Sequence, residues 1–287
     1  MAQIREIKKR MVAVRTIQRI TKTMQMIATA KFTASLARAK ATRPYTDRIR
    51  QLVGEVAAAA GDVSHPLLQG GGSSGKVLVL VIGSDRGLCG ALNTNVFKST
   101  LLLMREWQGK GAKVNLCLLG SKGVAFFRRL GTPILASATG LGDKPHVRQL
   151  LGSVKVMLDA YRDGSIDRLF IVNAEFVNTM TQKPTVTQLL PAQTIDDGEL
   201  QDMWDYIYEP NAADILDGVL MRYIESQVYR AAVESVACEM AARMVAMKAA
   251  SDNAGNLIGD LQLIYNKARQ AAITKELAEI VGGAAAV

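Results

Sequence analysis

A glycine-rich loop directly after an apolar run is the segment of this sequence best placed to do chemistry. The loop Gly83–Gly90 reads GSDRGLCG and follows the apolar run Val77–Ile82. Loops in this position bind phosphate when backbone N–H groups at a helix start point toward the ligand. The glycine spacing, however, matches neither G-x-G-x-x-G nor G-x-x-x-x-G-K-[ST]. We therefore interpret Gly87 and Gly90 as parts of a tight strand-to-helix turn, with Asp85 capping the start of the helix that follows.

The remaining reactive side chains show no catalytic or metal-binding spacing. His65 and His146 each stand alone beside a proline, without an H-E-x-x-H pattern. Cys89, Cys117 and Cys238 form no C-x-x-C pair, and we interpret them as small buried apolar residues. The sequence thus predicts no catalytic residue, no cofactor and no metal ligand.

The elements that position this loop form an alternating pattern in the middle of the chain. Short apolar runs alternate with stretches of helical periodicity, which predicts a Rossmann-like α/β domain with a mainly parallel sheet and helices on both faces. A further run bounded by two prolines predicts a strand at the sheet edge. The predicted strands are 77–82, 114–119, 169–173 and 185–190, and the predicted helices are 93–107, 122–130 and 146–161.

Two unusually long helical stretches flank this domain. In the first, from Gln3 to about Ala60, a bend is expected near Pro44. The second runs from Ala212 to Ile280 without a proline and would reach roughly 100 Å at ~1.5 Å per residue. An isolated helix of that length cannot bury its apolar side, so the two are expected to form an antiparallel coiled coil. The apolar series in the first helix is Ile4, Ile7, Met11, Val14, Ile17, Ile20, Met24 and Ile27.

These patterns divide the chain into three parts. Residues 1–60 form the N-terminal coiled-coil helix, 76–194 the α/β domain, and 205–287 the C-terminal segment and helix. The glycine and serine run Gly70–Gly75 is the expected linker at the first boundary. Residues 1–60 and 205–287 together are expected to make one shaft.

Charge is concentrated at the N-terminus. The first 50 residues hold thirteen Lys and Arg against Glu6 and Asp47, whereas the whole chain carries a net charge of +9. A basic amphipathic helix of this kind could bind nucleic acid, an anionic membrane or an acidic protein, act as a transit peptide, or simply be solvated. Its few aromatic residues and its length disfavour nucleic acid and a transit peptide. No apolar run approaches the ~18 residues of a membrane span, and the charged start lacks the centre of a secretory signal.

Three segments carry a resemblance to a known family. The first is Ile20–Ala28 with Ala30 and Lys31, the second is Ser84–Gly90 with Asn93, and the third and most specific is Met247–Ala254 followed by Leu263–Gln270 and Ile273, Thr274, Glu276 and Leu277. In this order they resemble the gamma subunit of F-type ATP synthases over nearly the whole chain. Chloroplast members carry an inserted segment with a cysteine pair, and Gln193–Gly198 leaves no room for it, which favours a bacterial type.

The resemblance implies a rotor with no catalytic site of its own. The coiled coil would turn inside a hexamer of alpha and beta subunits, couple ion flow to ATP synthesis or hydrolysis, and regulate the ATPase, at the cytoplasmic face of the cell membrane. It implies hexamer contacts for Met24, Arg243, Arg269, Gln270, Thr274 and Glu276. A plain contact within the coiled coil is the competing interpretation of these residues. The apolar end 280–287 is expected either to be a low-friction bearing or to be a disordered tail.

The acidic and aromatic run 204–210 resembles the foot of the gamma subunit, which meets the membrane c-ring and the epsilon subunit. Tyr206 and Tyr208 would share one side of an extended segment, beside Glu209. The alternative is a strand within the protein's own sheet. No nucleic acid and no direct membrane insertion are expected.

Overall fold

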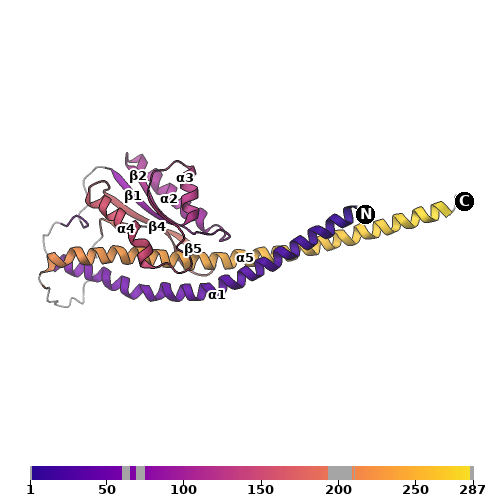
Figure 1. Ribbon diagram of the computed structural model, residues 1–287, viewed down its shortest axis with the longest axis horizontal. Helices are drawn as coiled ribbons and strands as arrows, with labels where there is room; N and C mark the ends of the chain where they lie inside the picture. Colours follow the sequence, from indigo (N-terminus) through magenta and orange to yellow (C-terminus); the bar gives the residue numbers. More distant parts are fainter. Residues whose placement is uncertain (1, 60–64, 69–74, 193–208, 210, 285–287) are drawn as a thin grey trace. The chain divides into compact units, whose positions relative to one another are not determined.

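The computed structural model describes residues 2–59, 65–68, 75–192, 209 and 211–284. Two long helices, α1 (Ala2–Ala59) and α5 (Ala212–Ala284), enclose the other elements in the sequence. Figure 1 shows the α/β elements that lie between them in the chain. The chain divides into two compact units: a smaller one of residues 1–29 with 243–287, and a larger one of residues 30–242. Both long helices therefore contribute to both units.

The larger unit is built on a five-stranded sheet in the order β3-β2-β1-β4-β5. Strands β1 to β4 run parallel, and β5 pairs antiparallel with β4 at the edge, as predicted. Apolar β1 lies in the middle of the sheet, where both faces are covered. The strands are β1 (Lys76–Ile82), β2 (Lys113–Leu119), β3 (Ile134–Ala138), β4 (Arg168–Phe176) and β5 (Gln182–Leu190).

Strand β3 is an element that the sequence reasoning did not predict. It is only five residues long, ILASA, and it occupies the edge beside β2, where its residues are alternately half-buried and exposed. Neither a continuous apolar run nor a polar–apolar alternation marks it in the sequence. Pairing with β2, and not local propensity, therefore determines this strand.

Helices cover the two faces of the sheet with separate cores. Helices α2 (Leu92–Gly109) and α3 (Ser121–Arg129) pack on one face around Val79 and Phe127. Helix α4 (Val147–Arg162) packs on the other, where Leu80 and Met157 share a core with parts of α1 and α5. This arrangement, visible in Figure 1, confirms the α/β fold with helices on both faces.

Within the larger unit α1 and α5 lie antiparallel. The Arg43 guanidinium is 3.3 Å from the Glu234 carboxylate, and the Arg230 guanidinium is 3.1 Å from Asp47. Pro44 lies inside α1 with an exposed side chain. One series of buried and half-buried residues along α1 recurs in steps of four and three, the spacing of a coiled-coil seam. They are Phe32, Ser35, Ala39, Thr42, Thr46, Ile49, Val53 and Val56.

In the smaller unit the seam differs from the apolar series expected there. Ile17, Ile20 and Ile27 are 53%, 53% and 50% exposed. A heptad seam advances 3.5 residues at a time, whereas the apolar series takes two consecutive steps of three after Val14 and so leaves the seam by one position. Beyond Val14, small and polar residues occupy the seam instead. Its members in this unit are Ile7, Met11, Val14, Gln18, Thr21, Gln25 and Ala28.

Candidate partner-binding surface and the crevice beside the sheet

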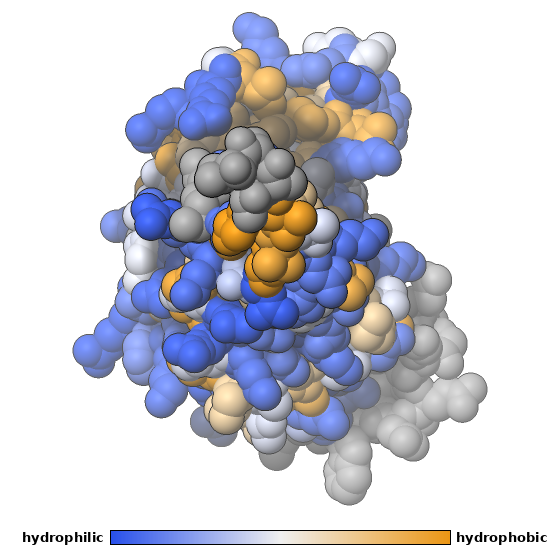
Figure 2. Space-filling model, turned by 90° about the vertical axis from the view of Figure 1, so that its right-hand side faces the viewer, coloured by the Kyte–Doolittle hydropathy of each residue, from blue (hydrophilic) through white to orange (hydrophobic). Residues whose placement is uncertain are grey.

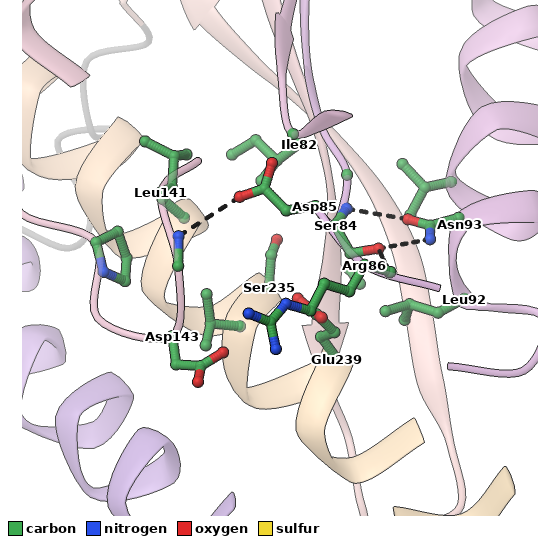
Figure 3. Close-up of a pocket in the computed structure, with 18 residues that line it drawn as sticks. Ile82, Ser84, Asp85, Arg86, Leu92, Asn93, Leu141, Asp143, Ser235 and Glu239 are labelled. Atoms are coloured by element: carbon green, nitrogen blue, oxygen red, sulfur yellow. Dashed lines mark hydrogen bonds between the residues drawn. The ribbon is translucent and has the colours of Figure 1, made fainter. Parts of the chain in front are cut away.

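The loop after β1 lies where an α/β sheet usually offers a ligand site. The chain continues from β1 to β2 on one side and reaches β4 on the other, so the strand order reverses between β1 and β4. Ligands of open α/β sheets bind in the crevice at the carboxyl ends of the strands at such a point. Ile82 of β1 and Ala174 of β4 line a cavity here (Figure 3).

Helix α5 occupies most of this crevice. Ala232, Ser235, Val236 and Glu239 line the cavity from the helix side, and about 40 Å³ of space remains. That volume accommodates a few water molecules, while pockets for small molecules measure about 300–1,000 Å³. In this protein the crevice therefore holds the long helix in the place where a nucleotide would lie.

Asp85 joins three segments at the rim of the crevice. Its carboxylate accepts hydrogen bonds from the Ser121 backbone N–H at 3.0 Å, the Ser121 hydroxyl at 2.9 Å and the backbone N–H groups of Gly140 and Gly142 at 3.1 and 3.4 Å. Ser121 begins α3, so the expectation that Asp85 caps the helix directly after its own loop is wrong. Strands β1 and β2 pair in parallel, so the loop after β1 and the start of α3 after β2 lie at the same edge of the sheet. Asp85 therefore reaches the start of α3.

Two opposing effects act on the pKa of Asp85. Burial raises it, and the hydrogen bonds from Gly140, Ser121 and Gly142 lower it. The hydrogen bonds together outweigh burial, so the pKa of this carboxyl lies below its ordinary value. Asp85 is therefore an ionised structural clamp at neutral pH.

Hydrogen bonds between Ser84 and Asn93 stabilise the turn at the start of the loop. The Asn93 carboxamide accepts from the Ser84 backbone N–H at 3.1 Å and donates to the Ser84 hydroxyl at 2.7 Å. The Ser84 hydroxyl in turn donates to the carbonyl oxygen of Arg86 at 2.6 Å. Gly90 has a φ of 58°, as expected for a glycine in this tight turn. The loop is thus held closed by its own side chains.

The cysteines and histidines have structural surroundings. Cys89, Cys117 and Cys238 are all buried and free, as predicted. Burial raises the pKa of the Cys117 thiol to about 12, which keeps it protonated. His65 Nδ1 accepts from the Leu67 backbone N–H at 3.2 Å. Across the residues that the structure describes, no group of three His, Cys, Asp or Glu side chains is arranged to hold a metal ion.

The smaller unit exposes large apolar side chains on both of its helices. Beside the exposed isoleucines of α1, several large apolar side chains of α5 are exposed. Figure 2 looks onto the C-terminal end of α5, where hydrophobic residues gather among hydrophilic ones. The exposed large apolar residues of α5 in this unit are Leu257, Leu263, Ile264, Ile273, Leu277, Ile280 and Val281.

The predicted contact residues occupy different environments. Arg269, Gln270, Thr274 and Glu276 are exposed on α5, and Met24 is half-buried on α1, all within the smaller unit. Arg243 is 8% exposed and interacts within the chain. Glu209 is exposed, whereas Tyr206, Tyr208 and the linker 70–74 lie outside the described residues. Sequence reasoning missed that Ile17 and Ile20 point outward. The two consecutive steps of three in the apolar series depart from a strict heptad, and this departure is the signal that could have revealed it.

Long paired helices with exposed apolar sides, attached to an α/β unit whose crevice is filled by its own helix, define a helical stalk protein of a larger assembly. The ATP synthase family model matches residues 3–287. The ATP synthase gamma chain of Nitrosococcus oceani is 54% identical over 290 residues, covering all of both chains. The chain therefore belongs to the ATP synthase gamma chain family.

Solved structures agree on the fold. The rotor of the Euglena gracilis mitochondrial ATP synthase contains a chain that is 19% identical, with a TM-score of 0.63, covering 95% of this chain and 99% of that one. The Tetrahymena thermophila central stalk and c-ring structure contains one at 22% identity and a TM-score of 0.58, covering 81% and 99%. The protein is a non-catalytic subunit, the central rotor stalk of its ATP synthase. None of its described helices is long and apolar enough to cross a membrane.

Proposed function

We propose that this gamma chain transmits torque by inserting its smaller unit into the hexamer of alpha and beta subunits. The larger unit then lies toward the epsilon subunit and the c-ring, with the complex at the cytoplasmic face of the cell membrane. The shaft consists of residues 1–60 and 205–287, and the α/β domain of residues 76–194. Ion flow turns the shaft, and the shaft biases the nucleotide sites of the hexamer and so regulates ATP hydrolysis.

The exposed apolar residues of the smaller unit are the observation that supports this proposal. A monomer gains nothing from holding Ile17, Ile20 and Ile27 in water, because each large apolar side chain contributes about 1.5–3 kcal/mol when buried. Contiguous exposed apolar surface marks an interaction site. An enclosing partner that makes few directional bonds would cover this surface and still let it turn.

The mechanism requires the shaft to contact equivalent subunits differently. Two helices of unequal sequence present different side chains to each surrounding subunit at a given angle. A subunit's open or closed state then shifts by its difference in contact free energy. Because the states of the subunits alternate as the shaft turns, rotation and nucleotide exchange are coupled.

Individual residues have proposed parts in these contacts. The exposed polar residues Arg269, Gln270, Thr274 and Glu276 offer hydrogen bonds to beta-subunit loops that form only at certain angles. Met24 contributes at the neck, the region where the paired helices would pass the moving lower parts of the beta subunits. Arg243 would reach the hexamer only through the small exposed part of its side chain.

The foot completes the proposal. Tyr206, Tyr208 and the exposed Glu209 are proposed contacts to the c-ring and epsilon subunit, an assignment that rests on their resemblance to the family foot. They would attach the shaft to the part of the complex that ion flow turns. The apolar end of α5 would serve as the bearing at the opposite end of the shaft.

Co-purification with alpha and beta subunits tests the proposal. The variant Ile20→Asp, Ile27→Asp places charges on the exposed side of the smaller unit, and Leu102→Asp, Leu130→Asp places them on exposed positions of the larger unit. We expect the first pair to reduce recovery of the assembled hexamer at least about tenfold, and the second to leave it near wild type. Equal recovery for both pairs would show that the smaller unit is not the part that inserts.

A further inference from the structure

A groove between α2 and α3 lies on the larger unit, and none of the residues assigned to rotation above lines it. We define the α2–α3 groove by the residues that line it. It has a volume of about 540 Å³, within the range of natural binding sites. Its lining residues are Asn93, Thr94, Phe97, Lys98 and Leu101 of α2, and Lys122, Ala125, Phe126 and Arg129 of α3.

The floor of the groove is aromatic and rigid. The rings of Phe97 and Phe126 stack with centroids 4.9 Å apart, and Phe127 meets both edge-on at 5.4 and 5.0 Å. Phe97 and Phe127 are buried in the core, while Phe126 remains 36% exposed on the groove side. The floor is therefore an apolar surface already fixed by core packing, which lowers the ordering cost of binding.

The rim of the groove is basic. Lys98, Lys122 and Arg129 are exposed, and no ion pair holds any of them among the described residues. Of the described residues that line the groove, none is acidic. The three cations thus create an uncompensated positive potential around an apolar floor.

We propose that the α2–α3 groove binds an acidic amphipathic helix of another protein. Asn93 to Leu101 spans roughly 12 Å at ~1.5 Å per residue, the length of about two turns of a docked helix. One apolar side chain on the buried side of that helix contacts Phe126, and carboxylates on its flanks pair with the rim cations.

The recessed floor favours a helix over a membrane. A lipid surface is approached by apolar side chains that project beyond their basic neighbours. Here Phe97 and Ala125 line a concavity, and the longer Lys98 and Arg129 surround it. A convex partner fits this shape better than a flat bilayer does.

Binding of defined probes to the purified full-length chain tests the proposal. The first is a synthetic helical peptide of about 18 residues with leucine on one side and glutamate elsewhere. The second replaces every glutamate with lysine, and the third probe is a vesicle containing anionic lipid. We expect the glutamate peptide alone to bind, with an affinity that falls as salt is raised. Failure of the glutamate peptide to bind, or preferential binding of the vesicle or the lysine peptide, would overturn the proposal.

Charge and shape variants locate the site. Lys98→Glu, Lys122→Glu should weaken binding of the glutamate peptide about tenfold or more. The matched pair Arg148→Glu, Lys155→Glu makes the same charge change at exposed positions of α4, and should alter binding less than about twofold. Equal weakening by the two pairs would mean that only net charge matters, contrary to the proposal.

Ala125→Arg separates shape from charge. It adds a positive charge and fills the groove at an exposed position of α3, so the fold does not depend on it. We expect it to abolish binding of the glutamate peptide. Tighter binding to this variant would show that the groove itself is not the site.

Discussion

At the scale of single residues, the loop after β1 illustrates how a motif with a ligand-binding appearance can be structural. Asp85 uses both carboxylate oxygens to fix backbone N–H groups of two other loops. Ser84 and Asn93 satisfy each other across the turn. The backbone N–H and hydroxyl of Ser84, which could otherwise meet a phosphate, are therefore already paired within the protein.

Replacing Asp85 tests this role. Asp85→Asn removes the charge and turns an amide N–H₂ toward N–H donors, so we expect a loss of about 1–3 kcal/mol in unfolding free energy at pH 7. Because folding lowers the pKa, the charge stabilises the protein above the unfolded pKa of about 3.9 and loses that effect as pH falls through the folded pKa. Urea unfolding from pH 7 to 3 should show the two proteins converging below about pH 4. A difference that is constant with pH would contradict the charge argument.

Gly120 lines the same crevice, at a position that only glycine can occupy without strain. Its φ is 97°, and a Cβ there would lie against the Gly83 carbonyl, 2.7 Å from its carbon. Gly120→Ala should therefore destabilise the chain by more than about 2 kcal/mol, since both backbone conformation and space oppose it. Gly109→Ala, at the last residue of α2, is the matched control, because nothing lies within 4 Å of the added methyl, and it should change the unfolding free energy by less than about 0.5 kcal/mol. Thermal unfolding of both variants checks the contrast.

At the scale of elements, the two long helices of the smaller unit pack along a seam that is only partly apolar. The seam of the smaller unit contains Gln18, Thr21 and Gln25, while Ile17, Ile20 and Ile27 lie outside it. Such a seam stabilises less per turn than one of leucine and isoleucine. The smaller unit is thus a coiled coil whose apolar residues serve two surfaces, one internal and one external.

Paired substitutions separate the two surfaces. Met11 is a buried seam residue and Ile20 is half exposed. Met11→Gln should lower the unfolding free energy of the isolated chain by about 2 kcal/mol or more, and Ile20→Gln should change it by less than about 0.5 kcal/mol. Ile20→Gln should instead weaken recovery with alpha and beta subunits. Equal effects of the two variants on the isolated chain would contradict the seam described here.

At the scale of the whole molecule, charge and apolar surface are combined on the N-terminal helix. The first 50 residues carry a net charge of +11, more than the +9 of the whole chain, and α1 also presents exposed isoleucines. Charge steers association with acidic partners, while apolar area stabilises the complex. A rotor needs both without any single contact that fixes one angle.

Met24 provides a test of that balance. Met24→Lys adds a charge at a half-buried position of α1, in the proposed neck, and Met24→Gln changes polarity without charge. A new ion pair with an acidic loop would hold one rotor angle and raise the barrier to stepping. We expect Met24→Lys to lower ATP-driven ion transport in membranes more than ATP hydrolysis, and Met24→Gln to lower both little. If transport and hydrolysis fall in proportion, the effect is on assembly or stability.

The sequence alone determined the class of fold, because periodicity and chain length are local properties. The long helices, strands β1, β2, β4 and β5, and the three sheet-covering helices all follow from patterns within single segments. The family also followed from local motifs, the most specific of which lies at the C-terminal helix. Its contact residues stay predictions, because they depend on surfaces of other subunits.

Only the tertiary structure decided which residues face which neighbour. Strand β3 exists through pairing with β2, and Asp85 caps α3 because strand register brings the two together. The crevice is filled by Ser235 and Glu239 from far along the chain. Each of these contacts joins segments distant in sequence, where local propensity carries no information and burial against a particular partner sets the free energy.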